Sequence, residues 1–142
     1  MAGSGQADYV ARLRARYPDR RIEWLGFVDS DTFYDQIDVA VLASIWPEPL
    51  PRTMIECLGR GKPMLFADAG GMPEIGHYSP RAIMYPHKSV RALGDAIEAV
   101  LVAPLQWKAA VPCEPKLLAE FSEDHVVDAY RAVYAGTMAQ QG

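Results

Sequence analysis

The centre of the chain reads VAVLASIWPEPLPRTMIECLGRGKPMLFA (Val39–Ala67), in which two short apolar runs flank a helical pattern. The first run, Val39–Ala43, shows no alternation of polar residues and predicts a strand that is covered on both faces. The stretch Pro51–Arg60 carries its apolar residues on one helical face and predicts a helix that ends at glycines. The second run, Pro63–Ala67, predicts another buried strand. This strand–helix–strand order predicts a parallel sheet.

The flanking regions continue the alternation of helices and strands. They predict a helix over Gln6–Tyr17, a strand over Ile22–Val28, a helix that Ser30 caps and that runs through Gln36, a strand over Ala82–Tyr85, a helix that Ser89 caps and that runs through Val102, and two helices over Glu114–Phe121 and Glu123–Met138. Apolar stripes predict buried faces at Leu93, Ile97, Val100 and Leu101 and at Val126, Val127, Tyr130 and Tyr134. We therefore expect one α/β domain with helices on both faces of its sheet.

Composition excludes several classes of protein. The chain has 142 residues, of which 50% are apolar, a net charge of −4 and a mean hydropathy of −0.06, which excludes intrinsic disorder and a polytopic membrane protein. A pI near 5.3 argues against a nucleic-acid partner. Cys57 and Cys113 lie far apart without a Cys-x-x-Cys pair, so we expect two buried thiols of a cytoplasmic protein. His77, His87 and His125 lack the spacing of metal ligands and predict surface or structural roles.

The loop Ser44–Pro51 follows the first strand of this pattern, where parallel sheets bind their ligands. Three prolines make it stiff. Pro51 fits the first helical position, which leaves the N–H groups of Arg52, Thr53 and Met54 open to an anion such as phosphate. Trp46 can stack on a ligand ring or pack against the loop, and Asp38 is best interpreted as a structural hydrogen-bond acceptor.

Two carboxylates, Glu48 and Glu56, lie eight positions apart in this loop and helix. A carboxylate that faces a ligand there accepts hydrogen bonds from vicinal hydroxyls, as an acidic residue does for a ribose. From the spacing alone, two solvated surface carboxylates are the alternative.

Three segments together resemble one enzyme family. Ser44–Pro63 contains the Glu-x7-Glu pair and a helix that ends in Gly-x-Pro before a strand, as in the retaining GT-B glycosyltransferases of family 4. Asp68–Ile75 is similar to the Gly-Gly-x-Pro-Glu loop that follows in that family. Leu25–Val28 and then Ile37–Val41 resemble its preceding segment. The resemblance covers roughly Gly3–Val102, in the same order and at the same separations.

The resemblance implies a Rossmann-like fold and assigns the whole of residues 1–142 to the C-terminal, donor-binding lobe of such an enzyme. It implies that Glu56 holds the ribose hydroxyls of the donor nucleotide, and that Glu48, as the catalytic residue, contacts hydroxyls of the transferred sugar. Backbone N–H groups around Arg52 and Thr53 would meet the diphosphate, and Val28 with Asp29 would line the base pocket. The donor site would be bordered by Gly70, Gly71, Met72, Pro73 and Glu74.

The chain also departs from the family pattern. Leu50-Pro51 stands where many members have Phe-Gly, and the family's Arg and Lys that neutralise the diphosphate have no match. The family's upstream acceptor-binding lobe is absent. Ala2–Gly5 comes directly before a helix, where a preceding strand is expected, so we interpret the chain as truncated at its N-terminus.

These implications define the expected function. The full-length protein would be a cytoplasmic hexosyltransferase that moves a sugar from a nucleotide sugar to an acceptor in glycan or polysaccharide biosynthesis, while the isolated chain would be inactive. In such enzymes a helix N-terminus and basic residues would stabilise the diphosphate leaving group, so we expect no metal and no cofactor. Peripheral membrane association of the full-length protein stays open. The alternatives are a GT-B relative such as an epimerase or phosphorylase, and a non-catalytic nucleotide-binding or interaction domain of the same fold.

Overall fold

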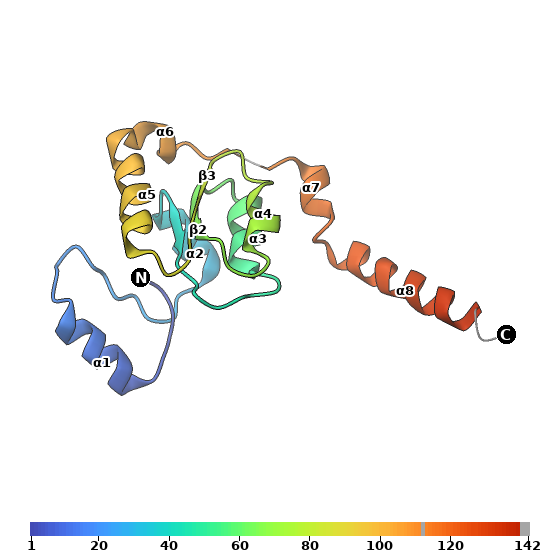
Figure 1. Ribbon diagram of the computed structural model, residues 1–142, viewed down its shortest axis with the longest axis horizontal. Helices are drawn as coiled ribbons and strands as arrows, with labels where there is room; N and C mark the ends of the chain where they lie inside the picture. Colours follow the sequence, from blue (N-terminus) through green and yellow to red (C-terminus); the bar gives the residue numbers. More distant parts are fainter. Residues whose placement is uncertain (112, 140–142) are drawn as a thin grey trace. The chain divides into compact units, whose positions relative to one another are not determined.

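The computed structural model describes residues 1–111 and 113–139, and the chain divides into two compact units, Met1–Ile37 and Asp38–Gly142 (Figure 1). The larger unit contains a parallel sheet that, in the described residues, has three strands in the order β1-β2-β3. The strands are β1 (Ala40–Leu42), β2 (Met64–Ala67) and β3 (Ala82–Tyr85). The predicted parallel sheet is therefore confirmed.

Six helices accompany this sheet in the described part of the larger unit. They are α3 (Arg52–Gly59), α4 (Met72–Gly76), α5 (Val90–Val102), α6 (Pro104–Lys108), α7 (Pro115–Ala119) and α8 (Glu123–Ala139). Figure 1 shows α5 on one side of the sheet and α3 with α4 on the other, as expected for helices on both faces. Ser89 caps α5 as predicted, because its hydroxyl accepts a hydrogen bond of 3.2 Å from the N–H of Ala92.

The core lies where β2 meets α3 and α4. All four residues of β2 are buried, because this strand pairs on both sides and is covered on both faces. Met54 and Leu58 of α3 and Met72 of α4 are at most 2% exposed. Cys57 and Cys113 are buried free thiols, as expected. No helix in the described part of the chain is both long enough and apolar enough to span a bilayer.

Three predicted buried faces are wrong. Val41 of β1 is 48% exposed, because no element in the described residues covers the face of the strand on which it lies. Ala96 is the buried residue of α5, whereas Leu101 is 67% exposed, because the small alanine lets the helix lie close to the sheet. The stripe of α8, Val126, Val127, Tyr130 and Tyr134, is exposed because nothing in the described residues covers it.

Two short helices were not predicted. α4 and α6 are only five residues long, and a proline stands in the first turn of each. Proline is compatible with a first helical turn, since the N–H that it lacks has no partner there. Five residues are too few to show a helical period, so the sequence pattern did not reveal them.

The smaller unit contains α1 (Ala7–Arg16) and α2 (Ser30–Gln36). The predicted strand over Ile22–Val28 is wrong: in the described chain this segment makes a single parallel bridge, from Gly26 to Ala2. The backbone φ angles of Gly3 and Gly26 are 130° and 69°, outside the range of extended chains. Both segments therefore turn away after one bridge, and no ladder forms.

Candidate functional site

The loop after β1 and the turn after β2 lie against each other through their backbones. The N–H of Gly71 donates a hydrogen bond of 2.7 Å to the carbonyl oxygen of Glu48. A Cβ atom on Gly70 would lie 2.4 Å from the same oxygen, and one on Gly71 would lie 2.3 Å from the carbonyl oxygen of Pro49. Gly70 also has a positive φ of 58°. This approach requires glycine at both positions, and it brings the Glu48 loop to the Gly70–Glu74 segment.

The start of α3 differs in detail from the prediction. Pro51 is the residue before the helix and not its first residue. The N–H of Met54 donates a hydrogen bond of 2.9 Å to the carbonyl oxygen of Pro51. The prediction that this N–H is open to an anion is therefore wrong. Such tight bonds are a common way to satisfy the N–H groups of a first helical turn. The N–H of Arg52 has no acceptor among residues 1–111 and 113–139.

The two carboxylates of the Glu-x7-Glu pair are both half-buried. Glu48 lies in the loop that contacts Gly71, whereas Glu56 lies inside α3. Glu56 is four residues after Arg52, and this spacing places both side chains on the same face of the helix. Glu56 therefore lies on the helix face that starts at Arg52, the residue with the open N–H.

The remaining residues of the predicted glycine-rich border differ in what they can present. The side chain of Met72 is 1% exposed, so this residue can meet a ligand only through its backbone. Pro73 has no N–H to donate. Glu74 is exposed in the first turn of α4. Of this segment, Glu74 alone offers a side chain that can form hydrogen bonds in solvent.

Val28 and Asp29, the predicted base-pocket residues, belong to the smaller unit, where Val28 is half-buried. Asp29, and not Ser30 as predicted, caps α2: its carboxylate oxygen Oδ2 accepts hydrogen bonds from the N–H of Thr32 at 3.1 Å and from the Thr32 hydroxyl at 3.2 Å. These bonds lower the pKa of Asp29, since they favour the ionised carboxylate. One carboxylate oxygen is thus committed to the helix start.

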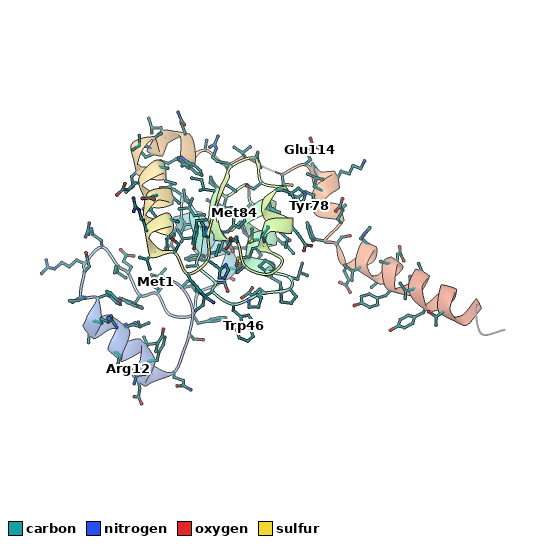
Figure 2. The ribbon with its side chains drawn as sticks, viewed as in Figure 1. Met1, Arg12, Trp46, Tyr78, Met84 and Glu114 are labelled. Carbon is teal, nitrogen blue, oxygen red and sulfur yellow. The ribbon has the colours of Figure 1, made fainter. Side chains whose placement is uncertain are left out.

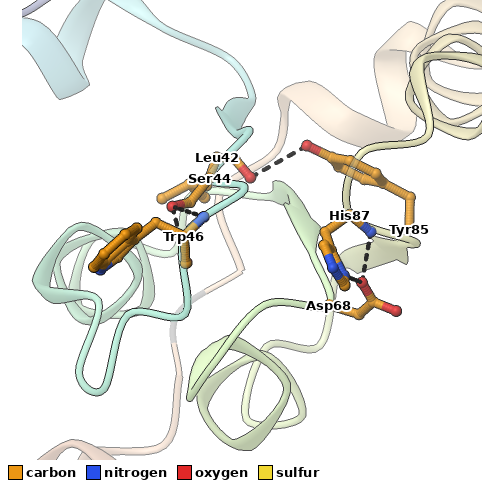
Figure 3. Close-up of polar contacts among 6 residues, drawn as sticks. All are labelled: Leu42, Ser44, Trp46, Asp68, Tyr85 and His87. Atoms are coloured by element: carbon orange, nitrogen blue, oxygen red, sulfur yellow. Dashed lines mark hydrogen bonds and ion pairs between the residues drawn. The ribbon is translucent and has the colours of Figure 1, made fainter.

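The carboxyl end of β3 adds polar contacts that the sequence pattern did not reveal (Figure 3). The buried Tyr85 donates a hydrogen bond of 3.3 Å from its hydroxyl to the carbonyl oxygen of Leu42. Asp68 Oδ1 accepts a hydrogen bond of 2.5 Å from the N–H of His87 and lies 2.7 Å from Nδ1 of the same residue. The available signal was an Asp and a His that follow two adjacent parallel strands.

Beside the Gly71 turn lies a groove with a volume of about 490 Å³. Its lining includes Pro49, Leu50, Gly71, Glu74, Ile75, His77, Tyr78, Glu120, Phe121 and His125. Tyr78 donates a hydrogen bond of 3.0 Å to Glu120, which raises the pKa of the tyrosine, and its ring packs edge-on against Phe121. Among the described residues, no group of three or more His, Cys, Asp or Glu side chains is arranged to hold a metal ion.

Two minor predictions can be compared with the structure. The ring of Trp46 is 70% exposed and does not pack tightly against its loop (Figure 2), while its backbone is bonded to the Ser44 hydroxyl. Asp38 lies 3.8 Å from the Lys108 ammonium nitrogen in an exposed ion pair. Trp46 orders the Glu48 loop through its backbone, because its carbonyl oxygen accepts a hydrogen bond of 2.9 Å from the N–H of Glu48.

This chain matches only part of the length of its relatives. An uncharacterized 42.6 kDa protein in the cps region of Klebsiella pneumoniae is 33% identical over 70 residues, which are 49% of this chain and 19% of that protein. An uncharacterized glycosyltransferase of Methanocaldococcus jannaschii is 30% identical over 106 residues, which are 71% of this chain and 27% of that protein. The chain thus spans about a fifth to a quarter of these relatives.

Solved structures show the same fold. The crystal structure of Anabaena HepE in complex with UDP and glucose superposes with a TM-score of 0.73 at 21% identity, over 96% of this chain and 39% of HepE. The complex of HepE with UDP-glucose gives a TM-score of 0.73 at 22% identity, over 96% of this chain and 40% of HepE. Residues 1–102 match the family model of the glycosyl transferases group 1. The chain therefore belongs to the group 1 glycosyltransferases.

Proposed function

We propose that residues 1–142 form the donor-binding lobe of a GT-B glycosyltransferase that transfers a hexose from a nucleotide sugar to an acceptor in glycan or polysaccharide biosynthesis. The contact between Glu48 and Gly71 carries the proposal, because it joins two loops at the carboxyl edge of the parallel sheet, where open α/β sheets bind ligands. The family match and the HepE complexes with UDP and UDP-glucose support a nucleotide-sugar donor.

In this proposal, the two half-buried carboxylates accept hydrogen bonds from the hydroxyl groups of the donor. Glu56 accepts hydrogen bonds from the ribose, and Glu48, the proposed catalytic residue, accepts them from the transferred sugar. The open N–H of Arg52, together with the backbone at Thr53, meets the diphosphate at the start of α3. The positive end of the helix dipole favours this negative charge, and it stabilises the diphosphate leaving group as the sugar departs.

The remaining predicted residues are assigned to the base of the donor and to the border of the sugar site. Val28 offers an apolar surface to the base. Asp29 offers its N–H, because its carbonyl oxygen accepts a hydrogen bond from the N–H of Phe33 and its carboxylate caps α2. Gly70 to Glu74 border the sugar, and Glu74 acts through its side chain. Gly71 and Met72 shape this border, because their N–H groups donate hydrogen bonds to the carbonyl oxygens of Glu48 and Ala69. The proposal needs no metal ion, so a chelator is expected to leave nucleotide binding unchanged.

Other features of the complete enzyme belong to the same proposal. The chain spans 39% of HepE, so we assign acceptor binding to a separate lobe of a longer protein. The two buried free thiols support a cytoplasmic location, where cysteines stay reduced. Peripheral contact of the complete enzyme with a membrane would fit an acceptor that is carried on a lipid.

Titration of the ¹⁵N-labelled chain with UDP tests the proposal. We expect shift changes confined to residues 26–30, 48–56 and 70–74, and a dissociation constant of about 1 mM, or about −4 kcal/mol. The chain alone is expected to transfer no sugar, because positioning donor and acceptor together supplies about 7 to 11 kcal/mol of a barrier. Shift changes at other residues, or micromolar affinity with measurable transfer, would contradict the assignment of a donor-binding lobe.

A further inference from the structure

The carboxyl end of β3 contacts the start of both loops that carry the proposed donor site. Leu42 is the last residue of β1, and its carbonyl oxygen accepts the hydrogen bond of the Tyr85 hydroxyl. Asp68 directly follows β2, and its carboxylate accepts the hydrogen bond of the His87 N–H. Figure 3 shows both contacts, from Tyr85 to Leu42 at the end of β1 and from His87 to Asp68 after β2.

These contacts lie beyond the ladder of the sheet. The last paired residues of β2 and β3 are Ala67 and Tyr85, and the N–H of Asp68 still donates a hydrogen bond of 2.9 Å to the carbonyl oxygen of Tyr85. The Asp68–His87 contact then extends the connection by side chain and backbone toward Gly70. The contact between Gly71 and Glu48 is therefore made by two loops, each tethered at its start to the same strand.

The contact between Asp68 and His87 acts on the turn after β2 more than on the stability of the whole domain. The side chains of His87 and Asp68 are 42% and 37% exposed, and exposed ion pairs add little to the stability of a fold. The N–H and ring of His87 nevertheless lower the pKa of Asp68, so its carboxylate is held in the ionised, accepting form. The contact thus orders the start of the Gly70 turn more than it stabilises the whole domain.

We propose that Tyr85 and His87 are positioning residues of the donor site, which act through Leu42 and Asp68 to hold the Glu48 loop against the Gly70–Gly71 turn. The identity of the ligand rests on the proposed function. The mechanical link between the end of β3 and the two loops rests on the hydrogen bonds alone.

Hydrogen exchange of the Gly71 amide measures this link without any ligand, because that N–H is bonded to Glu48. The whole chain is compared with Asp68→Ala, which removes the acceptor of both His87 contacts, with Asp68→Asn, and with Asp95→Ala on the exposed surface of α5 as a matched control. The Asn side chain keeps an oxygen that can still accept the hydrogen bond of the His87 N–H. We expect Asp68→Ala to raise the exchange rate of Gly71 about tenfold, the effect of losing about one hydrogen bond to a charged group.

Asp68→Asn is expected to restore the exchange rate to within about twofold of wild type, a small fraction of one hydrogen bond. Asp95→Ala is expected to leave it unchanged. An unchanged rate in Asp68→Ala, an equal rise in Asp95→Ala, or no recovery in Asp68→Asn would each overturn the link. Tyr85→Phe removes one hydroxyl and keeps the buried ring, so it tests the Leu42 contact separately and must also speed exchange at Gly71.

UDP affinity and the melting temperature then connect the link to function. Asp68→Ala is expected to weaken UDP binding several-fold, at about the level of one lost hydrogen bond, while the melting temperature stays the same and Asp68→Asn recovers the affinity. Loss of affinity in proportion to melting temperature would show a merely structural role and overturn the positioning role. If wild type binds no UDP, the proposed function fails, and the Gly71 exchange rates still decide the link.

Discussion

The N–H of Gly71 donates a hydrogen bond of 2.7 Å to the carbonyl oxygen of Glu48, so the turn after β2 is bonded to the backbone of the loop after β1. The two segments approach so closely that neither glycine of the turn has room for a side chain. The position of the proposed catalytic carboxylate therefore depends on residues that bear no side-chain chemistry of their own.

Gly71→Ala is expected to lower the free energy of unfolding by about 1 to 3 kcal/mol, the usual cost of overpacking a close contact. A Cβ atom there would lie 2.3 Å from the carbonyl oxygen of Pro49, and this atom belongs to a stiff backbone. Gly94→Ala is the matched control, because nothing lies within 4 Å of its Cβ position in α5. It should stabilise the chain by up to about 1 kcal/mol through better helix propensity. Urea denaturation measures both, and equal effects would contradict the close contact.

Glu56→Ala in the full-length enzyme is expected to weaken UDP binding by about 1.5 to 3 kcal/mol, since the ribose hydroxyls lose a charged acceptor. Glu48→Ala is expected to lower turnover more than UDP affinity, because the proposal places this carboxylate at the sugar. Calorimetry with UDP and steady-state kinetics separate the two effects. Glu98→Ala, on the exposed surface of α5, is the control. Equal losses of UDP affinity in the Glu48 and Glu56 variants would refute their separate roles.

Lys88→Gly is expected to stabilise the chain by about 1 kcal/mol. Lys88 has a φ of 65°, a left-handed conformation that costs a residue with a side chain about 1 to 2 kcal/mol, partly offset by the greater freedom of glycine when unfolded. Lys88→Ala keeps the Cβ atom and should leave stability nearly unchanged. Thermal and urea denaturation compare the variants, and a stabilised Lys88→Ala would show that the charge, not the backbone, is responsible.

The Asp19–Arg21 contact predicts a pH dependence in the smaller unit. Hydrogen bonds from the Arg21 side chain and N–H lower the pKa of Asp19 from 3.8 to about 2. Because the pKa is lower in the folded chain, the contact contributes fully above pH 4 and is lost as the pH falls through about 2. Arg21→Ala should return the pKa of Asp19 toward 3.8, whereas Arg20→Ala should not. Carboxyl NMR titration measures the value, and a pKa unaffected by Arg21→Ala would exclude the contact.

Local sequence patterns were sufficient to predict most strands and helices of the larger unit. The apolar runs at β1 and β2 and the spacing of apolar residues in α3 predicted the parallel sheet, because continuous apolar strands are stable only when helices cover them. The Ser89 cap of α5 was predicted from its position alone, since capping involves only the next few residues. The neighbourhood of Glu48 and the Gly70 turn also followed, because adjacent parallel strands end at the same edge of a sheet.

Contacts between distant segments could not be predicted in this way. Ile22–Val28 has the composition of a strand, but a strand exists only with a partner, and the glycine turns limit the pairing to one bridge. The stripe on α8 has the period of a buried face, yet burial depends on which other element reaches it. Likewise, the contacts of Tyr85 with Leu42 and of His87 with Asp68 join residues that are 43 and 19 positions apart, so only the packed sheet brings them together. Local sequence sets the conformation that a segment prefers, whereas long-range packing selects the partners that satisfy its polar groups and cover its apolar ones.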